Sequence, residues 1–365
     1  KIRKGEYAFT FAHNGLEALK LMVEHPDFDI VLSDINMPEM DGLTLLSKIN
    51  ELRNPAQKCI MVSAYGDMKN IRTAMNRGAF DFATKPIDMD DLSATIEKAI
   101  EQINFVKETQ KEHAALQSLQ SDMETAGEIQ RAILPNKFPP FPELANKLDI
   151  AASMTAAKVI GGDFYDFFRL DEDRIGFVIA DVSGKGIPAA LFMAVSNTLL
   201  RSVALASEDS AQCLTEVNNL LSRASVNSMF VTVCYGILNH KTGDIDFTNA
   251  GHTPAYILQA NGQVKEVEQY ANFVAGGIED FPYRSNTTRL EPGEAIVLYT
   301  DGVTEAFNET QEEFGVDRLK SSLTELCYAD AATVISGVHD DLRDFIRETE
   351  QSDDITMLVI KRKKI

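Results

Sequence analysis

The sequence Ala180-Asp181-Val182-Ser183-Gly184-Lys185-Gly186 decides the interpretation of the C-terminal part of this chain. It is one of five short polar motifs in that part, and four of them hold an Asp beside a strand-like apolar run. Asp is unfavourable within a strand, and several carboxylates that converge repel one another unless a cation lies between them. Hard divalent ions prefer oxygen ligands, so the pattern predicts a site for Mg²⁺ or Mn²⁺. The other motifs are Gly161-Gly162-Asp163-Phe164-Tyr165-Asp166, Asn249-Ala250-Gly251-His252, Thr300-Asp301-Gly302-Val303-Thr304-Glu305 and Ser352-Asp353-Asp354-Ile355-Thr356.

Length and composition limit the classes of protein to consider. The 365 residues suggest two domains plus a connector, and a 44% apolar content is sufficient for packed cores. A net charge of −20 argues against nucleic acid and anionic membranes as partners. The longest apolar-rich stretch, residues 187–200, contains polar residues and is predicted to be a buried helix rather than a membrane span. The cysteines form no CxxC pair and indicate reduced thiols in a cytoplasmic protein: Cys59, Cys213, Cys234 and Cys327.

Residues 1–98 alternate short apolar runs with helical stretches, which is typical of an α/β domain with a doubly wound parallel sheet. Three of the runs are predicted strands, and they end near Asp34, Ser63 and Lys85. Ligands of open parallel sheets bind outside the carboxyl ends of the strands. We therefore expect these three side chains to lie close together.

The stretch Ser33-Asp34-Ile35-Asn36-Met37-Pro38-Glu39-Met40-Asp41-Gly42 resembles the phosphorylation loop of two-component receiver domains. Ser63 and Lys85-Pro86 match residues that these domains carry after later strands, and Phe82 falls at their aromatic switch position. The resemblance implies that Asp34 accepts a phosphoryl group from a cognate sensor histidine kinase. A carboxylate nucleophile needs a cation and a hydrogen-bond donor for the phosphoryl oxygens, and Lys85 and Ser63 can provide them.

Receiver domains also carry paired acidic residues at the end of their first strand, which complete an Mg²⁺ site. No such pair precedes His13-Asn14-Gly15 in this sequence. The sequence is therefore predicted to be N-terminally truncated, with the receiver sheet lacking its first strand. Mg²⁺ is expected in the receiver only if the native protein has the missing acidic pair.

Residues 99–134 are predicted to be a helical connector within one long helical stretch that starts near residue 90. Apolar residues keep a coiled-coil spacing in two seams that are out of phase with each other. We expect a homodimer through parallel pairing of this helix; the alternative is a solvated spacer. The seams are Leu92, Ile96, Ala99, Ile103 and Val106, then Leu116, Leu119, Met123, Ala126 and Ile133.

Residues 143–362 are rich in predicted strands, with helices expected at 187–206, 211–225 and 331–348. This composition suggests an α+β domain, a β-sandwich flanked by helices. The five motifs resemble, in this order, the bacterial type 2C-like branch of the metal-dependent protein phosphatases, which includes sporulation and stress-response regulators. The resemblance covers about residues 120–362 and begins at Glu128-Ile129-Gln130-Arg131-Ala132-Ile133-Leu134-Pro135. It implies a serine/threonine phosphatase with two divalent ions, Mn²⁺ or Mg²⁺.

The resemblance also implies roles for individual residues. Asp181 matches the carboxylate that bridges the two metals, with the Val182 carbonyl as a neighbouring ligand. Asp301 and Asp353 match ligands of one metal, and Asp163 serves the other directly or through water. Two metals roughly 3.5–4 Å apart activate a water and support in-line attack on phosphorus.

Several other residues have open roles. Asp354 is a further candidate ligand, but the wider family often has Asn there. His252 can donate a proton to the leaving group, yet a structural role is favoured because a metal-bound water performs the attack. Lys185 can attract the substrate phosphate or pair with carboxylates. Arg131 and Arg169 are the candidates for a phosphate-anchoring arginine.

The leading hypothesis is a response regulator whose phosphorylation at Asp34 controls the phosphatase. By the family resemblance, the expected substrate is a phosphoserine on a STAS-type anti-sigma-factor antagonist, within a partner-switching pathway. The alternative is a catalytically inactive adaptor of the same fold that binds a regulatory partner under receiver control. The complete set of Asp163, Asp181, Asp301 and Asp353 favours the enzyme.

Overall fold

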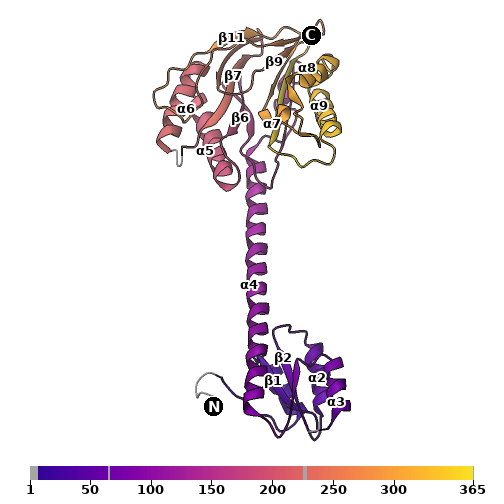
Figure 1. Cartoon of the computed structure of the whole chain (residues 1–365). Helices are drawn as coiled ribbons and strands as arrows, with labels where there is room; N and C mark the ends of the chain where they lie inside the picture. Colours follow the sequence, from indigo (N-terminus) through magenta and orange to yellow (C-terminus); the bar gives the residue numbers. More distant parts are fainter. Residues whose placement is uncertain (1–6, 65, 225–227, 365) are drawn as a thin grey trace. The chain divides into compact units, whose positions relative to one another are not determined.

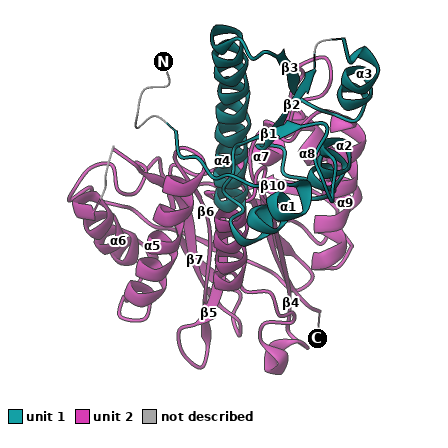
Figure 2. Ribbon diagram, turned by 90° about the horizontal axis from the view of Figure 1, so that it is seen from below, with its two compact units in different colours: residues 1–120 teal, residues 121–365 magenta. Residues whose placement is uncertain are grey.

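The computed structural model describes residues 7–64, 66–224 and 228–364, and it divides into two compact units, residues 1–120 and 121–365 (Figure 2). Each unit has its own hydrophobic core. The long helix α4, Met89–Ile133, contributes residues to both units (Figure 1). The predicted boundary between receiver and connector, at residues 98 and 99, falls inside this continuous helix, and it stays a prediction.

The first unit contains a parallel sheet of three described strands in the order β1-β2-β3. This confirms the predicted receiver architecture. The carboxyl ends of the strands meet at one edge of the sheet, where Asp34 pairs with Val62 and Ser63 with Thr84. The elements are α1 Gly15–Glu24, β1 Ile30–Asp34, α2 Gly42–Glu51, β2 Lys58–Ala64, α3 Met68–Asn76 and β3 Asp81–Lys85.

The phosphorylation-loop sequence leads directly into α2. The Asp41 carboxylate accepts a hydrogen bond from the Thr44 backbone N–H at 2.7 Å and thereby caps the helix. At Gly42, a Cβ atom would lie 2.2 Å from the carbonyl oxygen of Asp34. Only glycine therefore allows α2 to start this close to the end of β1.

The two predicted seams of α4 differ in their surroundings. Leu92, Ala99 and Ile103 from the first seam are buried in the single chain, so they are not available to a partner. Leu116 and Leu119 from the second seam are 67% and 52% exposed. The second seam therefore presents the more exposed apolar surface, since Ile96 and Val106 of the first seam are half-buried.

The second unit is the predicted β-sandwich flanked by helices. Its two antiparallel sheets have the strand orders β10-β9-β12-β13-β4 and β11-β8-β7-β6-β5. The elements of the first half are η1 Pro142–Leu144, β4 Leu148–Thr155, β5 Phe164–Arg169, β6 Arg174–Val182, α5 Ile187–Ala204, α6 Ser210–Ala224, β7 Val231–Asn239 and β8 Asp244–Ala250. Those of the second half are β9 Tyr256–Leu258, β10 Val264–Glu266, β11 Asn286–Arg289, β12 Ala295–Tyr299, α7 Asp301–Thr304, α8 Gly315–Glu325, α9 Ala331–Ile346 and β13 Ile355–Arg362.

Helices cover the outer face of each sheet (Figure 1). Helices α5 and α6 pack beside the sheet that contains β6 and β7, whereas α8 and α9 pack beside the sheet that contains β12 and β13. Of the described helices, only α5 has the length and apolar composition that a membrane span would need. Its inner side, including Met193 and Leu200, is buried in the core, as the sequence predicts. The four cysteines are free and buried, which also agrees with the prediction.

Candidate metal centre and phosphoacceptor site

The predicted metal-binding carboxylates lie where strand ends of the two sheets meet. Asp163 directly precedes β5 and Asp181 lies near the end of β6, and the Phe164–Ala180 pairing brings them side by side. In the other sheet, Asp301 follows β12 and Asp353 precedes β13, which is the partner strand of β12. Residues far apart in the sequence are thus gathered at one end of the sandwich.

Hydroxyl groups from one sheet hold the carboxylate of Asp163 from the other. Asp163 is only 2% exposed. Its Oδ2 atom accepts hydrogen bonds from the hydroxyls of Thr300 and Thr356, each at 2.7 Å. The Thr356 backbone N–H in turn donates to Thr300 Oγ1 at 3.0 Å. These bonds connect the two sheets at the candidate site and fix the position of Asp163.

Burial and mutual repulsion shift the carboxylates toward protonation. Burial raises the pKa of Asp163 well above its usual value, and the neighbouring charge of Asp181 adds to this effect. Burial also raises the pKa of Asp181 to about 7, with a further contribution from Asp301. The pKa of Asp301 is raised by burial and by Asp353, while the positive charge of Lys185 opposes the shift. A cluster of this kind is stabilised by protons or by bound cations.

The donor set matches a pair of hard divalent cations, because it consists of carboxylate oxygens and a backbone carbonyl. The carbonyl oxygen of Val182 lies 3.0 Å from the position that a Cβ atom on Gly162 would take, so bare backbone borders the cluster. Among the described residues, no three His, Cys, Asp or Glu side chains have their ligating atoms turned toward one point. The oxygens of Asp163 and Asp353 instead contact protein partners.

Asp354 contacts the backbone rather than the other carboxylates. Its Oδ1 accepts a hydrogen bond from the Ala157 N–H at 2.9 Å, and its Oδ2 accepts from Gly162 at 2.7 Å and from Asp163 at 3.4 Å. A Cβ atom on Gly161 would lie 2.2 Å from the same Oδ2. These contacts indicate that Asp354, a candidate ligand by its sequence position, positions the Gly161–Asp163 loop.

Gln130 is a residue of the site that the sequence does not predict. Its buried side chain donates to the Gly161 carbonyl at 2.6 Å and accepts from the Gly161 N–H at 3.0 Å. The end of α4 is thereby bound to the loop that carries Asp163. The available signal was the motif Glu128-Ile129-Gln130, whose spacing alone does not show what the glutamine contacts.

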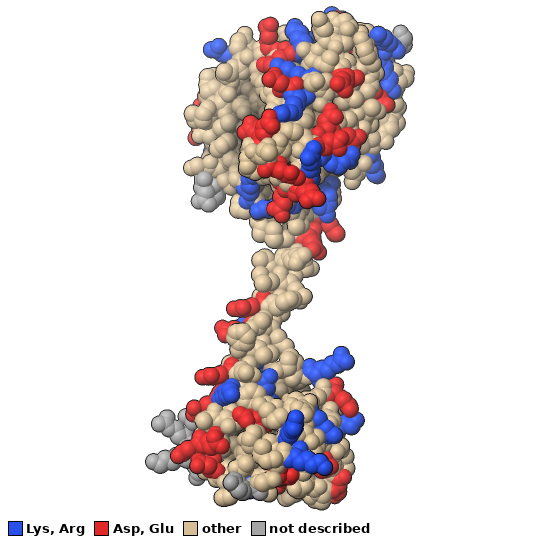
Figure 3. All heavy atoms as spheres, turned by 45° about the vertical axis from the view of Figure 1, so that its right-hand side comes forward, with Lys and Arg blue, Asp and Glu red and all other residues tan. Residues whose placement is uncertain are grey.

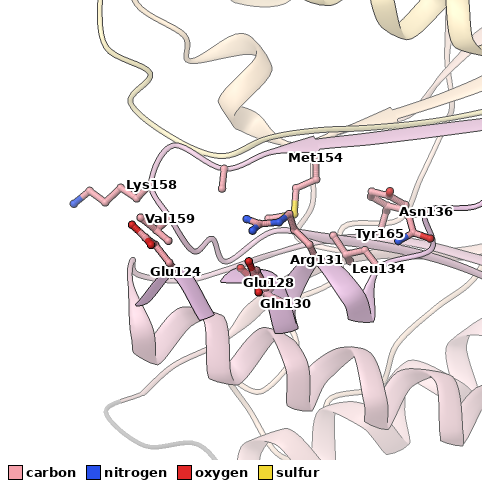
Figure 4. A pocket seen from close by; sticks show the side chains of 11 residues that line it. Glu124, Glu128, Gln130, Arg131, Leu134, Asn136, Met154, Lys158, Val159 and Tyr165 are labelled. Carbon is pink, nitrogen blue, oxygen red and sulfur yellow. The ribbon is translucent and has the colours of Figure 1, made fainter. Parts of the chain in front are cut away.

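A cavity of about 660 Å³ lies between the end of α4 and the chain before β5 (Figure 4). Arg131 and Lys158 are among the residues that line it. Arg169, the other arginine considered for phosphate anchoring, forms an ion pair with Glu143 and donates to the backbone carbonyls of Asp171 and Glu172. The guanidinium of Arg169 is therefore engaged by protein groups rather than open to a phosphate.

His252 has the surroundings of a structural residue. It is buried, and its Nδ1 atom lies 2.8 Å from the hydroxyl of Thr232. The Asn249 side chain accepts from the His252 N–H at 2.7 Å and ties the turn together. Burial lowers the pKa of His252 to about 4, so the ring is neutral near pH 7. These observations support the structural role favoured from the sequence.

The receiver residues gather as predicted at the carboxyl edge of the parallel sheet. Lys85 forms an ion pair with Asp34, whose other oxygen accepts from the Asn36 N–H at 3.2 Å. The Ser63 hydroxyl instead donates to Asp67 at 3.3 Å. Phe82 is half-buried and packs against the core of the unit. The first acidic pair of a receiver has no counterpart among residues 7–34.

Comparisons with known proteins agree with both units. The family model for the stage II sporulation protein E (SpoIIE) matches residues 171–363, and the response regulator receiver domain matches residues 2–97. The chain belongs to the SpoIIE family. Its second unit is a metal-dependent serine/threonine phosphatase domain, and its first unit is a receiver domain.

Individual relatives support this assignment. Phosphoserine phosphatase RsbU of Bacillus subtilis is 31% identical over 258 residues, which cover 69% of this chain and 75% of RsbU. Protein IcfG of Synechocystis is 29% identical over 66% of this chain, but the chain spans only 41% of its length. The solved SiaA-PP2C domain of Pseudomonas aeruginosa has the same fold, with a TM-score of 0.59 and 24% identity; the match covers 69% of this chain and 99% of that domain.

Replacing Asp354 tests its assignment as a positioning residue. We expect Asp354→Ala to lower the free energy of unfolding by about 1–3 kcal/mol, because it leaves buried backbone N–H groups without acceptors. Asp354→Asn should be milder, since its amide oxygen can still accept from one of them. Urea unfolding of the two variants measures this difference. Equal stability of both variants and the wild type would contradict the assignment.

Proposed function

We propose that this SpoIIE-family chain is a cytoplasmic response regulator that dephosphorylates a phosphoserine on a STAS-type anti-sigma-factor antagonist. The observation that carries the proposal is the gathering of Asp163, Asp181, Asp301 and Asp353 at one end of the sandwich. The similarity to a phosphoserine phosphatase, RsbU, supports phosphoserine as the substrate class. The STAS-type substrate rests on the family resemblance of the five motifs.

The carboxylates are assigned to two Mn²⁺ or Mg²⁺ ions. Asp181, with the Val182 carbonyl beside it, would serve both ions, Asp301 and Asp353 would hold one of them, and Asp163 would serve the other. Such a pair of ions lowers the pKa of a bound water and neutralises charge on the phosphoryl group. The hydroxyls of Thr300 and Thr356 keep the Oδ2 atom of Asp163 in place, and the Asp163 side chain also contacts that of Asp181.

The adaptor alternative is less favoured because none of the four carboxylates is replaced. Nucleic acid and membranes are not proposed as partners, since the net charge is −20. On the face shown in Figure 3, acidic and basic side chains are intermixed.

The receiver is proposed to control the phosphatase through phosphorylation of Asp34 by a sensor histidine kinase. Lys85 already contacts Asp34 and can bind a phosphoryl oxygen there. Helix α4 begins in the receiver unit, and Gln130 near its C-terminal end contacts the Gly161–Asp163 loop. A change in the position of α4 would therefore act on a metal-site residue through Gln130.

A homodimer is proposed through the second seam of α4. Leu116 and Leu119 are exposed at a spacing that suits helix pairing, and their burial by a second copy would be favourable. The first seam is not assigned to the dimer, because Leu92, Ala99 and Ile103 are already buried in the chain.

The phosphatase activity is tested with a phosphoserine-containing STAS-type protein as the substrate. The wild type is expected to release phosphate in the presence of Mn²⁺, and Asp301→Asn should lower kcat/KM at least about a hundredfold because a metal ligand is weakened. A wild type without metal-dependent release would contradict the proposed activity and favour the adaptor. Release from a generic phosphate ester that is as fast as from the protein would contradict the proposed substrate.

Coupling through Gln130 is tested by Gln130→Leu, with Gln117→Leu on the exposed part of α4 as the matched control. We expect Gln130→Leu to lower kcat by about tenfold, because the Gly161 N–H and C=O lose their partners and Asp163 is less firmly placed. Incubation with a small-molecule phosphoryl donor should change the rate of the wild type but not of Asp34→Asn or Gln130→Leu. A full response of Gln130→Leu to the donor would contradict this route.

The dimer is tested by sedimentation velocity at micromolar concentration. Leu119→Glu is expected to be a monomer where the wild type is a dimer, because it places a charge in the apolar seam. Gln117→Glu adds the same charge at an exposed polar position and should remain a dimer. A monomeric wild type, or a dimeric Leu119→Glu, would contradict pairing through this seam.

A further inference from the structure

Lys185 lies at the mouth of the metal site in the loop between β6 and α5. Its ammonium is 2.9 Å from Asp353 Oδ2 and donates to the Ser352 carbonyl at 2.8 Å. The side chain is 57% exposed, so solvent and a substrate can reach it. The flanking residues Gly184 and Gly186 have φ values of +89° and +78°, and a Cβ atom on either would contact nothing within 4 Å. No other group therefore packs against these two glycines where a side chain would stand.

Both oxygens of Asp353 are occupied in this structure. Oδ1 accepts from the Asp354 N–H at 2.9 Å, and Oδ2 is paired with Lys185. A metal ion that uses Asp353 as a ligand must therefore compete with the ammonium for Oδ2. The ammonium occupies the position that a metal ion would take beside the Asp353 carboxylate. Binding of a metal ion there would release the ammonium.

We propose that Lys185 is a phosphate-binding residue of the active site, paired with Asp353 until a metal takes that carboxylate. This inference rests on the proposed phosphatase function. The released ammonium stays at the open side of the carboxylate cluster, where a phosphoserine dianion has to approach. An ammonium with three donors on a flexible stem suits the oxygens of a phosphoryl group. Arg169 does not compete for this role, because Glu143 and two backbone carbonyls hold it.

The test compares Lys185→Gln with the wild type and with Lys241→Gln. Lys241 forms a similar exposed ion pair, with Asp173 at 2.6 Å, and lies beside the start of β6, at the end opposite to Asp181. We expect Lys185→Gln to raise the KM for the phosphoprotein and the inhibition constant of inorganic phosphate by about tenfold, because a charge-assisted hydrogen bond is lost. Lys185→Arg should restore much of the phosphate affinity, and kcat should change less than KM.

Calorimetric titration gives a second readout that is independent of turnover. Mn²⁺ should bind Lys185→Gln about two- to fivefold more tightly than the wild type, because no ammonium competes for Asp353. Inorganic phosphate should bind the Mn²⁺-loaded variant more weakly. Unchanged phosphate binding, or weaker Mn²⁺ binding, would overturn the inference. A wild type without turnover would refute the proposed function, whereas an active wild type with an unaltered Lys185→Gln variant would refute only the role of Lys185.

Discussion

The two hydrogen bonds from Thr300 and Thr356 to Asp163 are the contact on which the rest of the site depends. They connect the residue that follows β12 and the start of β13 with the residue that precedes β5, across the interface between the two sheets. Each threonine side chain holds the same carboxylate oxygen, so the sheets cannot slide past each other without breaking both bonds. The sandwich therefore supports the candidate metal centre, and the centre in turn helps to define how the sheets pack.

Gathering several carboxylates in one place is electrostatically unfavourable, and the hydrogen bonds of the fold do not fully offset their burial and mutual repulsion. Burial raises the pKa of Asp163 and Asp181, and the remaining carboxylates add repulsion. Protonation can relieve the repulsion, but so can a cation, and the oxygen-only donor set suits hard divalent ions. Partial compensation comes from Lys185 at the exposed side of the cluster. The site thus combines a buried part fixed by hydroxyls with a more open part in which the Lys185 ammonium pairs with Asp353.

Much of the architecture could be predicted from the sequence, since motif order and apolar periodicity identified both units and their sheets. The contacts around Asp163 could not, because Thr300 and Thr356 are 137 and 193 residues away, and their place at the ends of two motifs does not show what their hydroxyls contact. The spacing of motifs in the sequence also does not show whether the oxygens of a candidate ligand such as Asp354 face a metal or backbone N–H groups. The first seam of α4 illustrates the same limit. An apolar stripe predicts burial but not the surface that buries it, and here the chain itself covers Ala99 and Ile103.

The central claim is that the clustered carboxylates form a two-metal centre. It is tested most directly by calorimetric titration of the wild-type chain with Mn²⁺, compared with Asp181→Asn, which alters the carboxylate assigned to both ions. The account predicts binding of about two ions per chain, with a rise in Tm, and a loss of most of this binding in Asp181→Asn. A wild type that binds no Mn²⁺, or an Asp181→Asn variant that binds it as the wild type does, would contradict the account.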